Sequence, residues 1–321
     1  MPTSTSTTVQ RTREHLGQVG VWLGPPTLGI APAAAQRSAA ARIEAAGYGS
    51  LWGGEAINAK EAFAQHSILL AATESLIVGT GIANLWARHG SAMQGGAAAL
   101  AEAYPGRFIL GVGVSHPHQA ARAGYEYGRP LQRMNEYLDQ MEAAAKSPFL
   151  AEPFPFVLAA LGPKMLEVAR DRADGAHPFL SPVEHTARAR QILGPDKLLI
   201  PHQAVVLEPD PAQARATARA NLAVGQAATS VYGQNFKRLG YTDEDLSDGF
   251  SDRLIDAIVA WGDEAAIARR IQEHLDAGAD HVLVHPITSD HVMTRPAPQD
   301  VSTAADHLER LAPALPISSA A

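Results

Sequence analysis

Short apolar runs alternate with longer amphipathic stretches along the chain from Gln18 onward. The apolar runs are bounded by glycine or proline and predict strands at 19–23, 50–52, 76–83, 108–113, 156–160, 176–180, 203–207 and 281–284. Between them, apolar residues recur at helical spacing and predict helices at 33–46, 63–73, 93–104, 131–145, 164–171, from 182 onward, and at 301–311. Strands that alternate with helices form βαβ units and hence a parallel sheet.

The number of these units indicates the architecture. Eight of them over this length predict a closed (β/α)8 TIM barrel of the α/β class, formed by one domain over residues 17–321. Residues 1–16 are rich in threonine and serine and lack periodicity, so we expect a flexible tail. About seventy residues separate the last two strands, with predicted helices at 212–224, 230–238, 253–261 and 263–277. We expect 225–252 to form a helical insertion over the barrel mouth.

Composition narrows the class of protein. The chain has 321 residues, of which 46% are hydrophobic, and a net charge of −7 with no basic block. A large core is therefore expected, whereas a nucleic-acid surface is not. The absence of cysteine excludes disulfides, thiolate nucleophiles and iron–sulfur clusters. The polar amino terminus and the lack of an apolar run near ~20 residues predict a cytoplasmic protein that acts on a small molecule, with no membrane partner.

Chemistry in such barrels lies at the carboxyl ends of the strands. Schiff-base catalysis needs a lysine there, and the five lysines lie elsewhere, apart from one at a helix start. His116, His118, His177 and His285 follow strands without a carboxylate on the same strand, so no metal site is expected. Glu55 is the single acid at a strand end, which excludes a paired-carboxylate glycosidase. Because few reactive side chains lie at the strand ends, a bound cofactor is expected to supply the chemistry.

Two loops suit the phosphate group of such a cofactor. Leu161-Gly162-Pro163 joins the fifth strand to a helix, where small residues let backbone N–H groups approach an anion. Ser181-Pro182-Val183-Glu184 has the pattern of a capping box with proline at the first helical position. The alternative is that both are ordinary helix starts, because every βα unit contains one.

Motifs around the third and fourth strands resemble the luciferase-like flavin and deazaflavin oxidoreductases. The stretch 76–84 is LIVGTGIAN, Arg88 follows it, and 105–113 is PGRFILGVG. AAGY at 45–48, LWGGE at 51–55 and AGADHV at 277–282 are similar to the same family. The likeness extends from Gly17 to Ile287 and is strongest to the branch that uses the deazaflavin coenzyme F420, with Trp261-Gly262-Asp263 before the last crossover helix.

The resemblance implies a flat redox ring at the carboxyl end of the barrel. It implies a non-prolyl cis peptide between Gly81 and Ile82 that presses on the central ring, although a simple bulge at the barrel rim would also suit glycine. Asn84 would offer its amide to ring heteroatoms. The implied cofactor-binding set is Gly81, Ile82, Ala83, Asn84, Gly113 and Val114 for the ring, and Ala160, Leu161, Gly162, Phe179, Leu180 and Ser181 for the phosphate-bearing tail. A homodimer is the habit of the family.

The chain departs from the family at two positions. Many relatives carry a histidine directly after the acid of the second strand, where this chain has Ala56. Sugar-phosphate dehydrogenases of the family carry a glutamate after the glycines of the fourth strand, where this chain has Val114. A sugar phosphate is therefore not expected, and the pocket is expected to be less polar, with His116 as the available proton donor.

Several side chains allow two interpretations. Glu55 either contacts the ring or substrate, or accepts backbone hydrogen bonds as a structural acid. His116 either protonates a substrate or is a solvated loop histidine. Tyr232 either covers the substrate or packs its own helix. Substrate walls are expected from Trp22, Trp52, Trp86 and His285, although tryptophan also fills cores.

The favoured function is an F420-dependent oxidoreductase of the luciferase-like class, which transfers a hydride between the deazaflavin and a small, apolar organic substrate. One alternative is a luciferase-like monooxygenase that uses flavin mononucleotide (FMN) and oxygen. Another is a catalytically silent flavin- or deazaflavin-binding protein.

Overall fold

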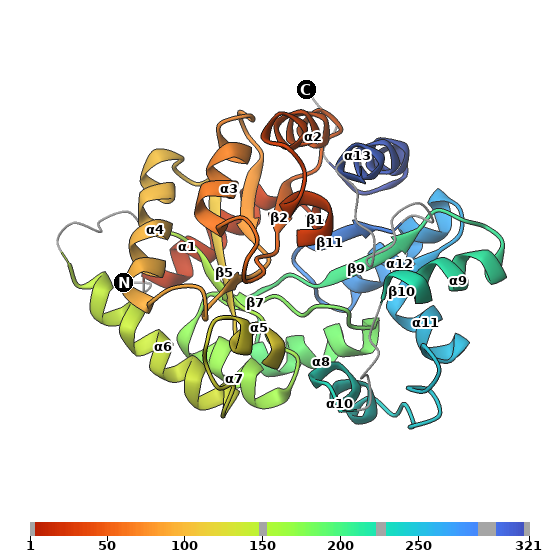
Figure 1. Cartoon of the computed structure of the whole chain (residues 1–321). Coiled ribbons are helices and arrows are strands. Elements are labelled where there is room, and N and C mark those ends of the chain that lie inside the picture. The colour runs from red at the N-terminus through yellow and green to blue at the C-terminus, as the bar shows by residue number, and fades with distance from the viewer. Residues whose placement is uncertain (1–3, 148–152, 223–228, 288–299, 318–321) are drawn as a thin grey trace.

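The computed structural model describes residues 4–147, 153–222, 229–287 and 300–317. Its centre is a curled parallel sheet surrounded by helices (Figure 1). The strands are β1 (Val19–Leu23), β2 (Ser50–Gly53), β3 (Ile77–Thr80), β4 (Ala83–Asn84), β5 (Phe108–Gly113), β6 (Phe156–Leu158), β7 (Gly175–Ala176), β8 (Leu198–Leu199), β9 (His202–Val206), β10 (Val259–Trp261) and β11 (Val282–Pro286).

Most of the helices cover the outside of the sheet. The helices are α1 (Ser4–Leu16), α2 (Ala33–Ala45), α3 (Ala62–Leu70), α4 (Gly90–Ala103), α5 (Pro117–Arg122), α6 (Pro130–Ala145), α7 (Pro163–Arg172), α8 (Val183–Leu193), α9 (Pro211–Asn221), α10 (Val231–Arg238), α11 (Asp252–Ile258), α12 (Glu264–Asp276) and α13 (Asp300–Leu311). A π-helical turn (Pro25–Gly29) follows β1, and a 3-10 turn (Ala312–Ala314) follows α13.

The sheet closes on itself because β8 and β9 are consecutive parts of one bent segment. The strand order is β10-β9-β11-β1-β2-β3-β5-β6-β7-β8, with β4 paired to β5. Two backbone hydrogen bonds of 2.9 Å, from Ile200 to Ala176 and from His202 to Pro178, carry the ladder from β8 to the start of β9. β9 then pairs with β11, which pairs with β1. The TIM-barrel prediction is confirmed.

Buried side chains lie on both faces of the strands, as their continuous apolar sequences predict. One cluster fills the space between the sheet and the helices. A second fills the inside of the barrel with alternate strand residues, among them Ile77, Ile109, Val157 and Leu283. Because both layers are apolar, polar chemistry is confined to the strand ends.

The expected tail at residues 1–16 is wrong from Ser4 onward, where α1 begins. Val9 and Leu16 are buried and belong to the cluster inside the barrel. Arg13 pairs with Asp280 at 2.8 Å. The threonines and serines concealed an apolar spacing in which Val9, Thr12 and Leu16 occupy one face of a helix. α1 therefore closes the amino-terminal end of the barrel.

Other element predictions need smaller corrections. The predicted helix at 253–261 ends at Ile258, and Val259–Trp261 is an added strand on β9. The predicted strand at 176–180 is reduced to β7, because the chain turns away after Pro178. The predicted strand at 76–83 is divided into β3 and β4. α5 and β8 were not predicted.

The insertion expected at 225–252 has its own small core. Residues 223–228 lie outside the described residues. After them, α10 and the following loop bury Phe236, Tyr241, Leu246 and Phe250 against α11. The same cluster includes Ala204 and Val206 of β9, so the described part of the insertion is anchored to the barrel by apolar contact. Among the described residues, no helix is both long and apolar enough to cross a membrane.

Two buried histidines bridge elements at the amino-terminal and outer parts of the barrel. His281 Nδ1 donates to the carbonyl of Gly17 at 2.9 Å, and its Nε2 lies 2.7 Å from Ser50 Oγ. His274 bridges Thr186 and Gln203, at 2.8 Å each. Burial lowers the pKa of His281 to about 4 and that of His274 to about 3, so both are neutral in the fold.

We predict that Leu16→Ala lowers the free energy of unfolding by about 2–5 kcal/mol, because it empties space inside the barrel. Arg11→Ala, at an exposed position of the same helix, is the matched control. Urea denaturation followed by circular dichroism measures both. Equal midpoints for the two variants would restore the tail interpretation.

We also predict that the free energy of unfolding falls as the pH drops from about 6.5 toward 4. In this range His281 and His274 bind protons in the unfolded chain but stay neutral in the fold, because burial lowers their pKa. His281→Gln should be less stable at neutral pH but should lose less stability between pH 6.5 and 5 than the unaltered protein does. His15→Gln, on the exposed face of α1, is the control. An unchanged pH slope in His281→Gln would contradict the assignment.

Candidate functional site

The carboxyl ends of the strands converge on an aromatic cluster. The rings of Trp22 and Phe179 have centroids 4.8 Å apart, and His285 lies 4.7 Å from Trp22. His202 stacks on Phe179 at 3.8 Å. Trp22, Phe179 and His285 were predicted as site residues, and the fold brings them together. Polar groups near them act in a setting largely screened from water.

The link between β3 and β4 lies against this cluster. The peptide bond between Gly81 and Ile82 is cis, at the position where the resemblance implies one. Trp22 Nε1 donates to the carbonyl of Gly81 at 2.6 Å, and the amide of Glu55 donates to the carbonyl of Ile82 at 3.0 Å. A Cβ on Gly113 would lie 2.8 Å from the side chain of Ile82, so glycine is needed for this close approach.

The contacts of Glu55 are those of a structural acid, the second of its two interpretations. Its carboxylate forms two hydrogen bonds with Arg88, and the two side chains are 4% and 9% exposed. The same carboxylate accepts from the amides of Asn84, at 2.7 Å, and Ala62, at 3.1 Å. With four donors directed at it, Glu55 ties the end of β2 to β4 and to the start of α3.

Asn84 presents an unused hydrogen-bond donor. Its side chain is 0% exposed, and its Oδ1 accepts from the amide of Trp86 at 3.1 Å. Its Nδ2 has no partner among the described residues. Buried polar atoms are nearly always hydrogen-bonded, so this amide fits a ligand that supplies an acceptor. Ala83, its neighbour in the predicted set, is fully buried beside it in the strand.

The two loops predicted for the phosphate group leave donors open. Gly162 is the N-cap of α7 and forms no side-chain cap. The capping box at Ser181 is wrong, because Pro182 is the N-cap of α8 and no side chain caps it. Ser181 Oγ is instead buried without a partner among the described residues. Because Pro182 is the N-cap, α8 begins at Val183, one residue later than predicted. The hydroxyl of Ser181 therefore remains available to a ligand.

The backbone flanking these loops is constrained. Ala160 and Leu180 are buried, and Leu180 has a positive φ of 49°. Ser115, which follows Val114 after β5, also has a positive φ, of 51°. Non-glycine residues in this conformation are enriched where surroundings enforce a functional geometry.

His116 and Tyr232 meet at one side of the mouth. Their rings are 5.8 Å apart, and Tyr232 is 6.4 Å from Phe179. His116 stacks against His118 at 5.5 Å. Burial, with a smaller contribution from His118, lowers the pKa of His116, and burial strongly raises that of Tyr232. At neutral pH both are uncharged groups able to share a proton with a ligand.

Two predicted substrate walls lie elsewhere. Trp52 is inside the barrel, its Nε1 donates to Ser50 Oγ at 2.9 Å, and its ring leaves no room for a Cβ on Gly79. Trp86 packs behind β4, with Nε1 on the carbonyl of Val114 at 2.8 Å and Arg133 over its ring. Both tryptophans fill cores, the alternative that the sequence left open.

Sequence reasoning missed His202 at the mouth and named His177 only among the histidines that follow strands. His202 Nε2 lies 3.0 Å from His285 Nδ1. His177 is buried near Trp52, with Nδ1 on the carbonyl of Ile200 and no partner for Nε2 among the described residues. The predicted seventh strand begins at residue 203, whereas β9 begins at His202. The prediction therefore left His202 outside the strand by one residue.

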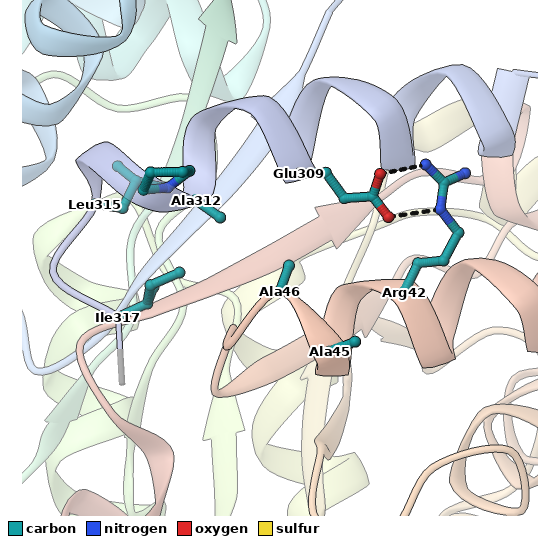
Figure 2. Close-up of a pocket in the computed structure, with 8 residues that line it drawn as sticks. Arg42, Ala45, Ala46, Glu309, Ala312, Leu315 and Ile317 are labelled. Atoms are coloured by element: carbon teal, nitrogen blue, oxygen red, sulfur yellow. Dashed lines mark hydrogen bonds and ion pairs between the residues drawn. The ribbon is translucent and has the colours of Figure 1, made fainter. Parts of the chain in front are cut away.

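A hollow of about 490 Å³ lies outside the barrel, between α2 and α13 (Figure 2). Arg42 pairs there with Glu309 at 2.6 Å, and the remaining lining is mostly alanine, leucine and isoleucine. None of the predicted site residues lines it. Among the described residues, no group of three or more histidine or acidic side chains could hold a metal ion.

Comparisons with known proteins find a family model and several relatives that match this chain. A family model described as luciferase-like monooxygenase matches residues 8–281. The 5,10-methylenetetrahydromethanopterin reductase of Methanolobus tindarius is 26% identical over 149 residues, which cover 41% of this chain and 46% of that protein. The corresponding reductase of Archaeoglobus fulgidus is 24% identical over 149 residues, 41% of this chain and 45% of that protein. The chain thus spans less than half the length of these curated relatives.

Solved structures show the same fold over almost the whole chain. An F420-dependent secondary alcohol dehydrogenase in complex with an F420-acetone adduct has a TM-score of 0.71 at 16% identity, covering 93% of this chain and 99% of that one. The coenzyme F420-dependent tetrahydromethanopterin reductase of Methanopyrus kandleri gives 0.67 at 16% identity, with coverage of 93% and 98%. The oxygenating constituent of 3,6-diketocamphane monooxygenase from Pseudomonas putida, in complex with FMN, gives 0.62 at 13% identity, with coverage of 93% and 99%.

We predict that Glu55→Gln destabilises the fold by about 3–5 kcal/mol, because it leaves Arg88 buried without its carboxylate. Glu61→Gln removes the other, half-exposed partner of Arg88 and should cost far less. Denaturant unfolding compares the two. A Glu55→Gln protein as stable as Glu61→Gln, yet without cofactor-dependent turnover, would instead make Glu55 a catalytic residue.

Proposed function

The chain belongs to the luciferase-like monooxygenase family, and on that premise we propose that it is an oxidoreductase that binds coenzyme F420 at the barrel mouth. The reaction would transfer a hydride between this deazaflavin and a small, largely apolar organic substrate. Two F420-dependent enzymes share the fold over more than nine-tenths of the chain, which supports the choice of cofactor.

The observation that carries the proposal is the unpartnered amide of Asn84. It is fully buried, its Oδ1 is already held by Trp86, and its Nδ2 is directed at no acceptor among the described residues. A flat heterocycle with carbonyl oxygens and ring nitrogens supplies the missing acceptors. The unpartnered hydroxyl of Ser181 fits the phosphate-bearing tail in the same way. The residues present therefore fit this cofactor.

The chain's own contribution would be binding, orientation and exclusion of water. When bound, coenzyme F420 supplies the hydride-carrying carbon of its ring. Asn84 would fix the ring edge, the Gly81–Ile82 link would support its face, and the loops at Gly162 and Ser181 would hold the tail. Ala83, Gly113 and Val114 would complete the ring's surroundings, and Ala160, Leu161, Phe179 and Leu180 those of the tail.

The substrate would occupy the aromatic side of the mouth. Trp22 and Phe179 present apolar surface, and Val114 and Ala56 add no charge. Hydride transfer to a carbonyl carbon requires a proton for its oxygen, and the reverse transfer from an alcohol carbon requires removal of the hydroxyl proton. Tyr232 and His116 are the neighbouring groups able to exchange it, and His285 would bound the pocket opposite them.

An FMN-dependent monooxygenase is the second candidate, because a monooxygenase holding FMN shares the fold. Titration of the protein with F420 and with FMN, each oxidised and reduced, separates the two. Tight F420 binding and substrate turnover without oxygen uptake support the proposal. FMN binding with oxygen consumption coupled to substrate oxidation would replace it, and binding without any turnover would favour the silent binding protein.

We predict that Asn84→Asp weakens F420 binding by roughly 10- to 100-fold. Asp retains an oxygen for the amide of Trp86 but replaces the free donor with a second acceptor. Fluorescence titration of the coenzyme measures the dissociation constant.

Asn135→Asp, at an outer position of α6, is the matched control for the change in charge. Circular dichroism of each variant verifies the fold. Undiminished affinity in folded Asn84→Asp protein would mean that the amide serves no cofactor.

A further inference from the structure

The insertion places a cation beside the start of α7. A Cβ built on Gly162 would lie 3.5 Å from the Nη2 atom of Arg238, at the end of α10. Among the described residues, no carboxylate pairs with this guanidinium, and its side-chain hydrogen bond is a long one, 3.5 Å to Asn235 Oδ1. Arg215 and Arg219 of α9 are paired with aspartates, whereas the neighbouring Arg188 of α8 donates to the backbone carbonyl of Arg238 at 2.7 Å. Within the described part of the chain, Arg238 is therefore a cation without a carboxylate partner.

Buried donors without partners surround the same place. Asn235, one turn before Arg238 on α10, is 3% exposed, and its Nδ2 has no partner among the described residues. Ser181 is 1% exposed, and its hydroxyl is likewise unpartnered. The carbonyl of Leu161, which would repel an anion, is occupied by His185 Nε2 at 2.8 Å. Arg188 Nη1 of α8 donates to the backbone carbonyl of Arg238 at 2.7 Å, which places the end of α10 against α8.

The helix ends add further donors. α7 has ten residues and α8 has eleven, and neither has a side-chain cap. By contrast, α9, α10, α11 and α12 are capped by Asp210, Ser230, Ser251 and Asp263. The first N–H groups of an uncapped helix carry partial positive charge and attract anions. In α7 this donor is the amide of Lys164, because Pro163 has no N–H and the amides of Met165 and Leu166 donate to the carbonyl of Gly162. The first turn of α7 contains no acidic residue, whereas that of α8 contains Glu184, so the α7 end suits an anion better.

We propose that α10 completes a phosphate cradle, in which Arg238 and Asn235 close over a phosphate ester held at Gly162 and Ser181. The inference rests on the proposed function and deepens it, because the insertion would select coenzymes that carry the phosphate group. α10 also carries Tyr232, whose ring lies near His116 and Phe179. Phosphate capture and coverage of the substrate mouth thus depend on one helix.

The test compares ligands that differ by the phosphate-bearing tail. Dissociation constants are measured by quenching of tryptophan fluorescence for F420 against its deazaflavin riboside, and for FMN against riboflavin. Arg238→Gln should weaken binding of the phosphorylated member by roughly 10- to 100-fold and change that of the riboside by less than about twofold. Arg238→Lys should restore part of the loss.

Lys237→Gln is the matched control, since it removes the same charge one position earlier, where Lys237 pairs with Asp243. Its affinities should stay unchanged. A second readout uses inorganic phosphate alone: it should raise the unfolding temperature of the unaltered protein and of Lys237→Gln but not that of Arg238→Gln.

The outcomes separate the two proposals. Equal losses for the phosphorylated ligand and the riboside in Arg238→Gln would show that Arg238 merely organises the insertion, and would overturn the cradle. If the unaltered protein binds neither coenzyme, the proposed function fails. Stabilisation by inorganic phosphate that depends on Arg238 would then still support the cradle, and the absence of that stabilisation would overturn it.

Discussion

The ion pair between Glu55 and Arg88 is the interaction on which the mouth of the barrel depends. A carboxylate so deeply buried is costly unless every lone pair is satisfied, and here the guanidinium and the amides of Asn84 and Ala62 satisfy it. These donors belong to different elements, so the pair fixes β2, β4 and α3 relative to one another. The position of the Asn84 side chain follows from that anchor. An amide held rigidly before a ligand arrives loses little entropy when it binds.

The residues that close the barrel and the residues of the candidate site lie at opposite ends of the strands. α1 closes the amino-terminal end with Val9 and Leu16, and the polar groups of His281, Ser50 and Trp52 between this end and the level of Trp52 are hydrogen-bonded to one another. Unpartnered polar atoms near the sheet occur toward the opposite end, at Asn84 and Ser181. The insertion covers this end with α10, and its apolar residues share one cluster with Ala204 and Val206 of β9.

The strands and most helices could be predicted from sequence because their apolar periodicity is strong. β1 and β5 have the predicted bounds. α1 could not, because threonine and serine concealed its apolar face, and β10 could not, because its residues continue the pattern of α11. These errors share a cause, since tertiary contacts decide elements whose local signal is weak.

Some residues of the candidate site could be predicted from the sequence, and others could not. Asn84, Gly162 and Ser181 follow from motifs at strand ends. The structural role of Glu55 and the placement of Arg238 beside Gly162 arise from contacts between residues distant in the chain, for which no spacing gives a signal.

A crystal structure of the protein with bound F420 tests the central claim most directly. The account predicts the deazaflavin ring within hydrogen-bond distance of Asn84 Nδ2, with the phosphate group between Gly162 and Arg238. A coenzyme bound in the outer hollow between α2 and α13, or a mouth that stays filled by Trp22 and Phe179 at saturating coenzyme, would contradict it.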